Sequence, residues 1–349
     1  MRYILGFILF SVFVFLVSCD NTLDIVEESG DIPVVYGFLS ASDTIQLVRV
    51  ERAFIDENTS GLELAQDPSN FFYDESTTVS LVNLDTQDEF AMTRVDGNQI
   101  GYVRDTGVFA NEPNYLYALD TDALNLDLDN LETVYQLQIQ RPGDLPLVTA
   151  RTLLVGESRI RRPLESNPSI DFGNYINPVL FIWRKGTNAR IYDINLRFNY
   201  QERIANSGDD WINKSATWIV AQNIEDPENA NESTIEYSER AEQFYNFVAN
   251  TIPVDESLIR RAIDVDVQII GAGGGVNEVD QVDIVEYIRV EGANLGITST
   301  QVVPSVTNLS EGRGIVGSTF TTTLEGVRLT DLSKDSLING QRTRNLNFQ

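Results

Sequence analysis

The stretch Ala189-Arg-Ile-Tyr-Asp-Ile-Asn-Leu-Arg-Phe-Asn-Tyr-Gln201 alternates between apolar and polar side chains over most of its length. The apolar side chains occupy every second position, and they are Tyr192, Ile194, Leu196, Phe198 and Tyr200. Successive side chains of a β-strand point to opposite faces, so this set predicts a long strand with one face in the core. The run Ala216-Thr-Trp-Ile-Val-Ala221 follows and predicts the returning strand of a hairpin. We therefore expect a mainly β protein.

Short apolar or alternating runs continue this pattern toward the N-terminus. Strands are expected at Pro33–Leu39, Thr44–Arg52, Thr77–Leu84, Gln99–Arg104, Tyr115–Leu119, Val134–Gln140 and Leu147–Leu154. The polar segment Ala65–Glu75 is expected to be a loop, and Asp96-Gly-Asn98 is expected to be a turn. About seven short strands separated by turns are typical of an immunoglobulin-like sandwich, which we place at residues 32–156.

The second half of the sequence predicts another β-rich domain, over residues 179–349, after a connection at residues 157–178. It opens with a strand at Val179–Trp183. Ser238–Asn250 predicts a helix, because Ala241, Phe244, Tyr245 and Val248 form an apolar stripe behind a capping serine. A second short helix is expected at Asp255–Ala262. Strands are expected at Val265–Ile270 and Val282–Val290, joined through the glycine-rich run Gly271-Ala-Gly-Gly-Gly275.

The N-terminus has the pattern of a bacterial signal peptide. Arg2 precedes an almost purely apolar run from Ile4 to Val17, which is short for a membrane span of about 20 residues. Leu16-Val17-Ser18-Cys19 then matches a lipobox, in which the cysteine becomes lipidated after cleavage. We expect residues 1–18 to be the signal peptide, Cys19 to be the lipid attachment site, and residues 19–31 to be an acidic tether. The alternative is an uncleaved signal anchor with an incidental cysteine.

Composition excludes several kinds of site. Cys19 is the single cysteine of 349 residues, so neither a disulfide nor a cysteine-based zinc site is possible within the chain. The 25 Lys and Arg residues against 52 Asp and Glu residues give a net charge of −27, which opposes nucleic-acid binding. The chain has no histidine, which excludes Ser-His-Asp and Cys-His catalysis and zincin motifs. Chemistry that uses only carboxylates, such as glycoside hydrolysis, remains open.

Three groups of residues are candidate sites. The run Gly271–Gly275 is interpreted as a hairpin loop, because a dinucleotide-binding turn must lead into a helix and the segment from Val276 is expected to lead into a strand. The pairs Asp120/Asp122, Asp127/Asp129 and Asp264/Asp266 lack the glycine and the closing glutamate of a calcium loop, so no metal and no cofactor are expected. Three tryptophans are candidates for a sugar-stacking platform, of which Trp183 and Trp218 are assigned to the core. Trp211, in the turn Gly208-Asp-Asp-Trp211, is expected to be exposed and is the weak candidate for ligand binding.

The chain resembles the Bacteroidota outer-membrane lipoproteins grouped as domain of unknown function 4249. The residues that carry this resemblance are the lipobox at Cys19, the opening Pro33-Val-Val-Tyr-Gly-Phe-Leu39, the strand Ile191–Tyr200 and the late segment Pro304–Ser318. In that segment Asn308, Gly312, Gly314 and then Ile315-Val316 correspond to the family's Asn and Gly-x-Gly-hydrophobic ending. The family often has an aromatic residue after the second glycine, and this sequence has Ile315 instead.

The resemblance implies a lipid-anchored outer-membrane protein that acts beside a TonB-dependent receptor. The acidic residues behind Cys19 resemble the surface-export signals of Bacteroidota lipoproteins, which gives a lean toward cell-surface exposure. The leading hypothesis is a non-catalytic binding or assembly accessory of such a receptor, with an unknown ligand. The alternatives are a structural envelope lipoprotein without a ligand and a carboxylate-based surface glycan hydrolase. The hydrolase reading requires a deep cleft with two carboxyl groups about 5–10 Å apart, whereas a binding module requires none.

Overall fold

The computed structural model describes residues 31–54, 59–124, 126, 130–173, 175, 177–225, 233–291 and 306–349. The predicted signal peptide, the lipidation site at Cys19 and the tether up to residue 30 lie outside the described residues. Residues Ile32–Gln349 form one compact unit. Among the described residues, no helix combines the length and apolar character needed to cross a bilayer.

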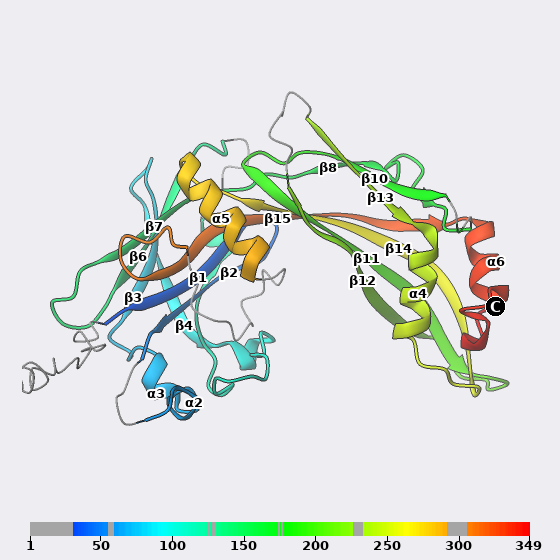
Figure 1. Cartoon of the computed structure of the whole chain (residues 1–349), viewed down its shortest axis with the longest axis horizontal. Helices are drawn as coiled ribbons and strands as arrows, with labels where there is room; N and C mark the ends of the chain where they lie inside the picture. Colours follow the sequence, from blue (N-terminus) through cyan, green and yellow to red (C-terminus); the bar gives the residue numbers. More distant parts are fainter. Residues whose placement is uncertain are drawn as a thin grey trace, which may run out of the picture. The chain divides into compact units, whose positions relative to one another are not determined.

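The protein is mainly β, as the alternating pattern predicts (Figure 1). One large sheet has the strand order β12-β11-β14-β15-β1-β2-β5-β4-β3-β6-β7, and β9 pairs with β15 beside this path. Its strands are β1 Pro33–Ser40, β2 Ile45–Arg52, β3 Thr78–Asn83, β4 Glu89–Asp96, β5 Tyr115–Asp120, β6 Val134–Gln140, β7 Val148–Leu153, β9 Ser169–Ile170, β11 Ala189–Ile204, β12 Ile212–Glu225, β14 Leu258–Gly273 and β15 Arg313–Leu329. A smaller sheet has the order β13-β10-β8, with bounds Thr234–Arg240, Pro178–Arg184 and Arg159–Arg162.

Strand β15 joins the two halves of the large sheet. Its first part runs parallel to β1, from the pair Val34↔Arg313 to the pair Ser40↔Thr319. Its later part runs antiparallel to β14, up to the pair Val265↔Val327. In the described part of residues 32–156, seven strands do form, but they share a sheet with strands of the second half, so the immunoglobulin-like detail is not confirmed. The segment 157–178, expected to be a connection, carries β8 and β9.

The long strand β11 has the predicted core face. Its five alternating apolar side chains, Tyr192, Ile194, Leu196, Phe198 and Tyr200, are all buried. They pack in one cluster with side chains of β10, α4, β14 and the C-terminal residues, which include Phe181, Phe244, Val267 and Phe348. Period-two burial along β11 therefore holds this half of the protein together.

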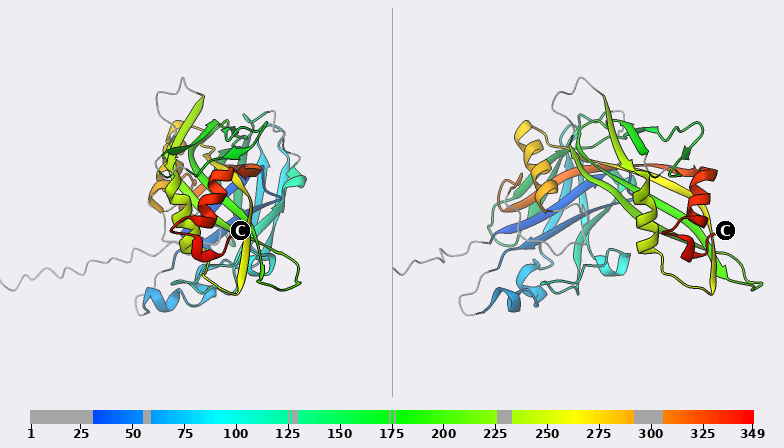
Figure 2. Two further views of the ribbon diagram at one scale, coloured as in Figure 1. Left: turned by 90° about the vertical axis from the view of Figure 1, so that its right-hand side faces the viewer. Right: turned by 45° about the vertical axis from the view of Figure 1, so that its right-hand side comes forward.

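Helix α4, Ala241–Thr251, confirms the predicted helix and its apolar stripe. The helix begins at residue 241 rather than 238, because Ser238–Arg240 end strand β13. Phe244 stacks on Phe172 with ring centroids 4.3 Å apart. Tyr245 donates a hydrogen bond to the Ser333 carbonyl of helix α6, Asp331–Asn339, at 3.2 Å, and the two helices lie side by side in Figure 2.

Two of the elements predicted for the second half of the chain are wrong. The segment expected as a helix at Asp255–Ala262 instead begins β14, because residues 258–262 pair with β11. The segment expected as a strand at Val282–Val290 belongs to helix α5, Glu278–Glu291. Ile284 and Ile288 are four positions apart and both are buried against Ile315, which is helical rather than period-two spacing.

Several short helical segments interrupt the loops. The expected loop Ala65–Glu75 contains α3, Pro68–Phe71, which follows α2, Gly61–Leu64. Three 3₁₀ turns, η1, η2 and η3, occupy Gly97–Ile100, Thr121–Leu124 and Arg344–Leu346. The turn expected at residues 96–98 is the start of η1, and the strand expected at residues 99–104 does not form.

A buried ionic cluster lies in the first half of the sheet. Oε1 of Glu51 on β2 is 3.2 Å from Nη1 of Arg49 and 3.0 Å from Nη2 of Arg104. The Arg104 guanidinium also lies over the rings of Phe71 and Phe109, at 5.2 and 5.3 Å from their centroids. Burial lowers the pKa of Arg104 to about 10, against the opposing pull of Glu51, so this arginine is charged at neutral pH.

Candidate binding surface

The outer face of β11, β12 and β14 carries a band of polar side chains, which we call the polar strip. β11 contributes alternate residues whose side chains point away from the core. The register places Gln201 opposite both Asn213 and Arg261, and places Arg197 opposite Asp266. The polar strip consists of Arg197, Asn199, Gln201, Arg203, Trp211, Asn213, Ser215, Arg261, Asp264 and Asp266.

The two aspartates of the polar strip are held by hydrogen bonds. Nε of Arg197 donates to Oδ2 of Asp266 at 2.9 Å, and Nδ2 of Asn199 donates to Asp266 and Asp264 at 2.9 and 2.8 Å. The backbone N–H of Gly326 donates to Oδ1 of Asp266 at 2.9 Å. Burial alone would raise the pKa of Asp266, but these donors and the Arg197 charge outweigh it and leave the pKa below its ordinary value.

The middle of the polar strip is a row of amides beside a hollow. Nε2 of Gln201 donates to Oδ1 of Asn213 at 2.6 Å, and Nε of Arg261 donates to Oε1 of Gln201 at 2.6 Å. The adjoining hollow has a volume of about 440 Å³ and is open to solvent. Its lining residues are Arg197, Asn199, Tyr200, Gln201, Asn213, Lys214, Ser215, Ile263 and Asp264. Amide, hydroxyl and charged groups therefore line a surface that a polar ligand can reach.

The far end of the polar strip is built around Trp211. The Arg203 and Arg261 guanidinium carbons lie 4.5 and 4.4 Å from the centroid of this ring. Trp211 is half-buried rather than exposed, because the two arginine side chains lie against it. Among the described residues, no carboxylate forms an ion pair with either arginine.

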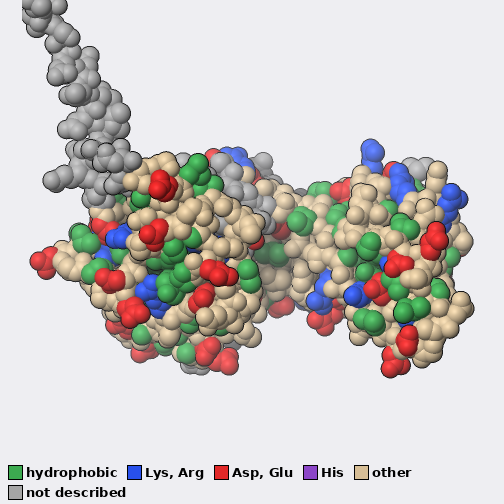
Figure 3. All heavy atoms as spheres, turned by 90° about the horizontal axis from the view of Figure 1, so that it is seen from below, with side chains coloured by type: hydrophobic (Ala, Val, Ile, Leu, Met, Phe, Trp, Pro, Cys, Tyr) green, Lys and Arg blue, Asp and Glu red, His purple; other side chains and the backbone are tan. Residues whose placement is uncertain are grey.

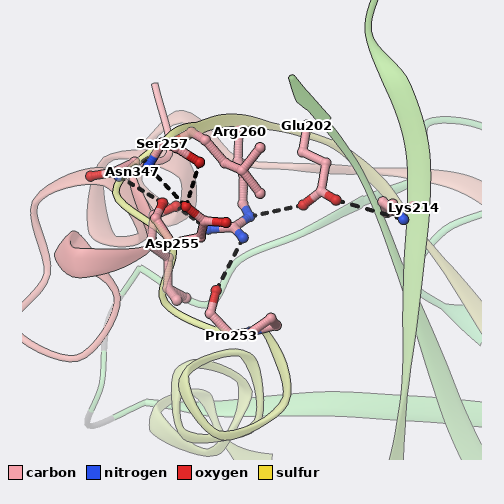
Figure 4. A network of polar contacts seen from close by, with 9 residues as sticks. Glu202, Lys214, Pro253, Asp255, Ser257, Arg260 and Asn347 are labelled. Atoms are coloured by element: carbon pink, nitrogen blue, oxygen red, sulfur yellow. Dashed lines mark hydrogen bonds and ion pairs between the residues drawn. The ribbon is translucent and has the colours of Figure 1, made fainter. Parts of the chain in front are cut away.

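Beneath the polar strip, Arg260 fixes the C-terminal segment against β14. Its fully buried guanidinium donates from Nε to Oε2 of Glu202 at 3.2 Å, from Nη1 to the Leu346 carbonyl at 2.8 Å, and from Nη2 to the Pro253 carbonyl at 3.0 Å. Lys214 lies 3.6 Å from the other Glu202 oxygen (Figure 4). Arg260, Glu202 and Lys214 all contact other groups of the protein, so this network stabilises the sheet beneath the hollow.

The other two tryptophans pack as the sequence predicts. Trp183 is fully buried and meets Tyr192 edge-on, with ring centroids 5.5 Å apart. Trp218 is partly buried and stacks on Phe247 of α4, at 6.0 Å. A sugar-stacking platform made of all three tryptophans is therefore not assembled, and Trp211 alone lies on the polar strip.

The hairpin predicted at the glycine-rich run Gly271–Gly275 is wrong. The run ends β14 and leads into α5. Gly274 has φ +91°, and its carbonyl accepts a 2.7 Å hydrogen bond from the N–H of Leu153 on β7. A Cβ on Gly274 would lie 2.4 Å from the Leu153 carbonyl oxygen, and a Cβ on Gly275 would lie 2.4 Å from the Gln281 nitrogen. The glycines therefore allow close backbone packing between the end of β14, β7 and the start of α5.

The predicted aspartate pairs do not form a metal cluster in the part of the chain that the structure describes. No group of three His, Cys, Asp or Glu side chains there is arranged to hold a metal ion. Asp264 and Asp266 are engaged by Asn199 and Arg197, as given above. Asp127 and Asp129 lie outside the described residues.

The late Asn–Gly–Gly motif has a backbone role. The Asn308 side chain pairs with the Val316 backbone, accepting from its N–H at 2.9 Å and donating to its carbonyl at 2.6 Å. Gly312 and Gly314 have φ +98° and +132°. A Cβ on Gly314 would lie only 1.8 Å from the Val35 carbonyl oxygen, so glycine is required where β15 meets β1.

Acidic side chains are scattered over the face shown in Figure 3, with Lys and Arg among them. No protein-family model matches this chain, and no curated protein matches it significantly. The fold and the polar strip define a mainly β protein with an open, polar surface on three neighbouring strands.

Proposed function

We propose that this chain is a lipid-anchored outer-membrane lipoprotein that serves as a non-catalytic binding or assembly accessory of a TonB-dependent receptor. The observation that carries the binding role is the polar strip beside the open hollow on β11, β12 and β14. Its amides, hydroxyl and guanidinium groups are the kinds of donors and acceptors that fix a polar ligand. The anchor rests on the lipobox sequence at Cys19.

The polar strip supports binding better than hydrolysis. A glycoside hydrolase needs one carboxylic acid whose pKa is raised so that it holds a proton at the working pH. The pKa of Asp266 is lowered instead, and Asn199 hydrogen-bonds to both Asp264 and Asp266. These carboxylates are therefore occupied as acceptors, and the hollow beside them is open rather than a deep cleft.

The lipid anchor is tested by a cysteine substitution. We expect the wild-type chain to incorporate a palmitate analogue and to fractionate with the outer membrane, and we expect Cys19→Ala to do neither. Ser18→Ala is the matched control, because it keeps a small residue before the cysteine and should still be acylated. Acylation of Cys19→Ala, or membrane retention of that variant, would contradict the anchor.

The accessory role is tested by purifying the full-length acylated protein from native outer membrane in mild detergent. Mass spectrometry should recover a TonB-dependent receptor in an amount comparable with the lipoprotein. Recovery of the lipoprotein alone, under conditions that preserve known receptor complexes, would favour the structural envelope role instead.

A further inference from the structure

Arg203 and Arg261 place two positive charges against one aromatic ring. Their guanidinium carbons lie 4.5 and 4.4 Å from the Trp211 centroid. The chain has a net charge of −27, yet neither of these two arginines forms an ion pair with a described carboxylate. Elsewhere in the fold the buried Arg49, Arg104 and Arg260 each contact a glutamate.

The hydrogen bonds leave donors of both arginines available. Arg261 uses Nε to bind Gln201, and Nε of Arg203 is buried without a partner. Within the described part of the chain, the terminal nitrogens of these two side chains donate to no acceptor. The ring of Trp211 stabilises the guanidinium groups by cation–π contact and limits their rotamers, so they are held in place before any ligand arrives.

Each guanidinium is planar, and one such group can donate two parallel hydrogen bonds to a carboxylate. Gln201 and Asn213 lie beside Arg261, and their amides are suited to sugar hydroxyls. The hollow of about 440 Å³ that they line is open, as an extended chain requires. Net acidity of the whole protein opposes long polyanions such as nucleic acid, because they would meet acidic surface beyond the polar strip.

We propose that the Arg203–Trp211–Arg261 end of the polar strip binds the carboxylate of an acidic oligosaccharide, with the neighbouring amides meeting the sugar hydroxyls. This inference rests on the proposed function, since it names the ligand class of that binding module. The guanidinium pair supplies selectivity for a charged sugar over a neutral one. Trp211 acts as a positioning residue that keeps the two cations together.

The test uses the full-length acylated protein in detergent and isothermal titration calorimetry with a hexamer of galacturonate. A neutral glucose hexamer of the same length and free acetate are the comparison ligands. We expect the uronate hexamer to bind at least about tenfold more tightly than the neutral one, since charge-assisted hydrogen bonds contribute about 1.5–3 kcal/mol each. The preference should shrink as the salt concentration rises.

Arg203→Gln and Arg261→Gln should each weaken uronate binding by about tenfold or more while leaving thermal unfolding close to wild type. The control is Arg159→Gln, because Arg159 is an exposed arginine of the other sheet, with a side chain 60% accessible. Arg261→Lys keeps the charge but loses the planar donor pair, and it should fall between wild type and Arg261→Gln.

Equal affinity for the uronate and neutral hexamers would overturn the proposal, as would equal losses in Arg203→Gln and Arg159→Gln. Binding of acetate as tightly as the hexamer would show a generic anion site and would also overturn it. Tighter binding of an acidic peptide than of the uronate would assign the site to a protein partner instead. The receptor purification above separates the two proposals: a chain that recovers its receptor but does not discriminate uronate keeps its function and loses only this ligand.

Discussion

Replacing Glu51 by Gln should be among the most damaging single changes in the first half of the protein. The carboxylate accepts from two buried guanidiniums, at 3.2 and 3.0 Å, and all three side chains are at most 9% accessible. Glutamine keeps the shape but leaves Arg49 and Arg104 without their shared negative charge. Breaking a buried ion pair by removing one partner costs about 3–5 kcal/mol. We therefore expect the free energy of unfolding to fall by about that amount.

Urea unfolding followed by tryptophan fluorescence measures this loss, with the midpoint shift multiplied by the slope of the transition. Glu165→Gln is the control, because Glu165 is 3.9 Å from Arg159 and both side chains are at least half accessible. An exposed pair of this kind contributes about 0–1 kcal/mol. The double variant E51Q/R104M should recover part of the loss, since it removes one unpaired cation. A Glu51→Gln loss no larger than that of Glu165→Gln would refute the reasoning.

Three further changes test other parts of the fold. Gly314→Ala should lower the free energy of unfolding by about 3 kcal/mol or more in the urea assay, because its Cβ would lie 1.8 Å from the Val35 carbonyl oxygen. The control Gly208→Ala has open space around its Cβ, so its free energy of unfolding should stay within about 0.5 kcal/mol of wild type. Asp266→Asn should be less stable than wild type at neutral pH, and the difference in urea midpoint should close below about pH 4. The reason is that the pKa of Asp266 is lowered in the folded state, so its stabilisation is present above the unfolded pKa of about 3.9 and is lost as pH falls through the folded value. A difference in urea midpoint that stays constant between pH 6 and 3 would contradict this. Phe348→Ala should cost about 3–5 kcal/mol in thermal or urea unfolding, since the ring is buried in the core beside Phe198 and Tyr200, and a loss under 1 kcal/mol would show that the C-terminal segment is not held there.

Period-two patterns predict the strands, because the apolar residues at alternate positions of the sequence are the side chains that the strand buries. Tyr192, Ile194 and Phe198 show this on β11. The failures came where local patterns conflict with distant pairing. Residues 258–262 contain polar and apolar side chains in a helical spacing, yet they form a strand because β11 offers a 16-residue partner. Conversely, valines and isoleucines of α5 favour a strand locally, but Ile284 and Ile288 are buried on one helical face.

The candidate surface was only partly predictable. Trp211 was singled out because it lies in a polar turn, and it does lie on the polar strip. The two arginines beside it were missed, since Arg203 and Arg261 are 58 positions apart and only the β11–β14 register brings them together. Alternation does place Arg197, Asn199, Gln201 and Arg203 on one face of β11. That common face was the available signal for the polar strip.

The place of β15 between β1 and β14 has a consequence for the order of assembly. Val34 of β1 pairs with Arg313, 279 positions later in the chain. During synthesis the edge of β1 that pairs with β15 therefore stays uncovered until almost the whole chain has been made. Such distant pairing slows folding, and an uncovered edge can recruit other chains. Truncation before residue 313 would leave that edge of β1 uncovered, so about the last tenth of the chain is needed to complete the pairing of its first strand.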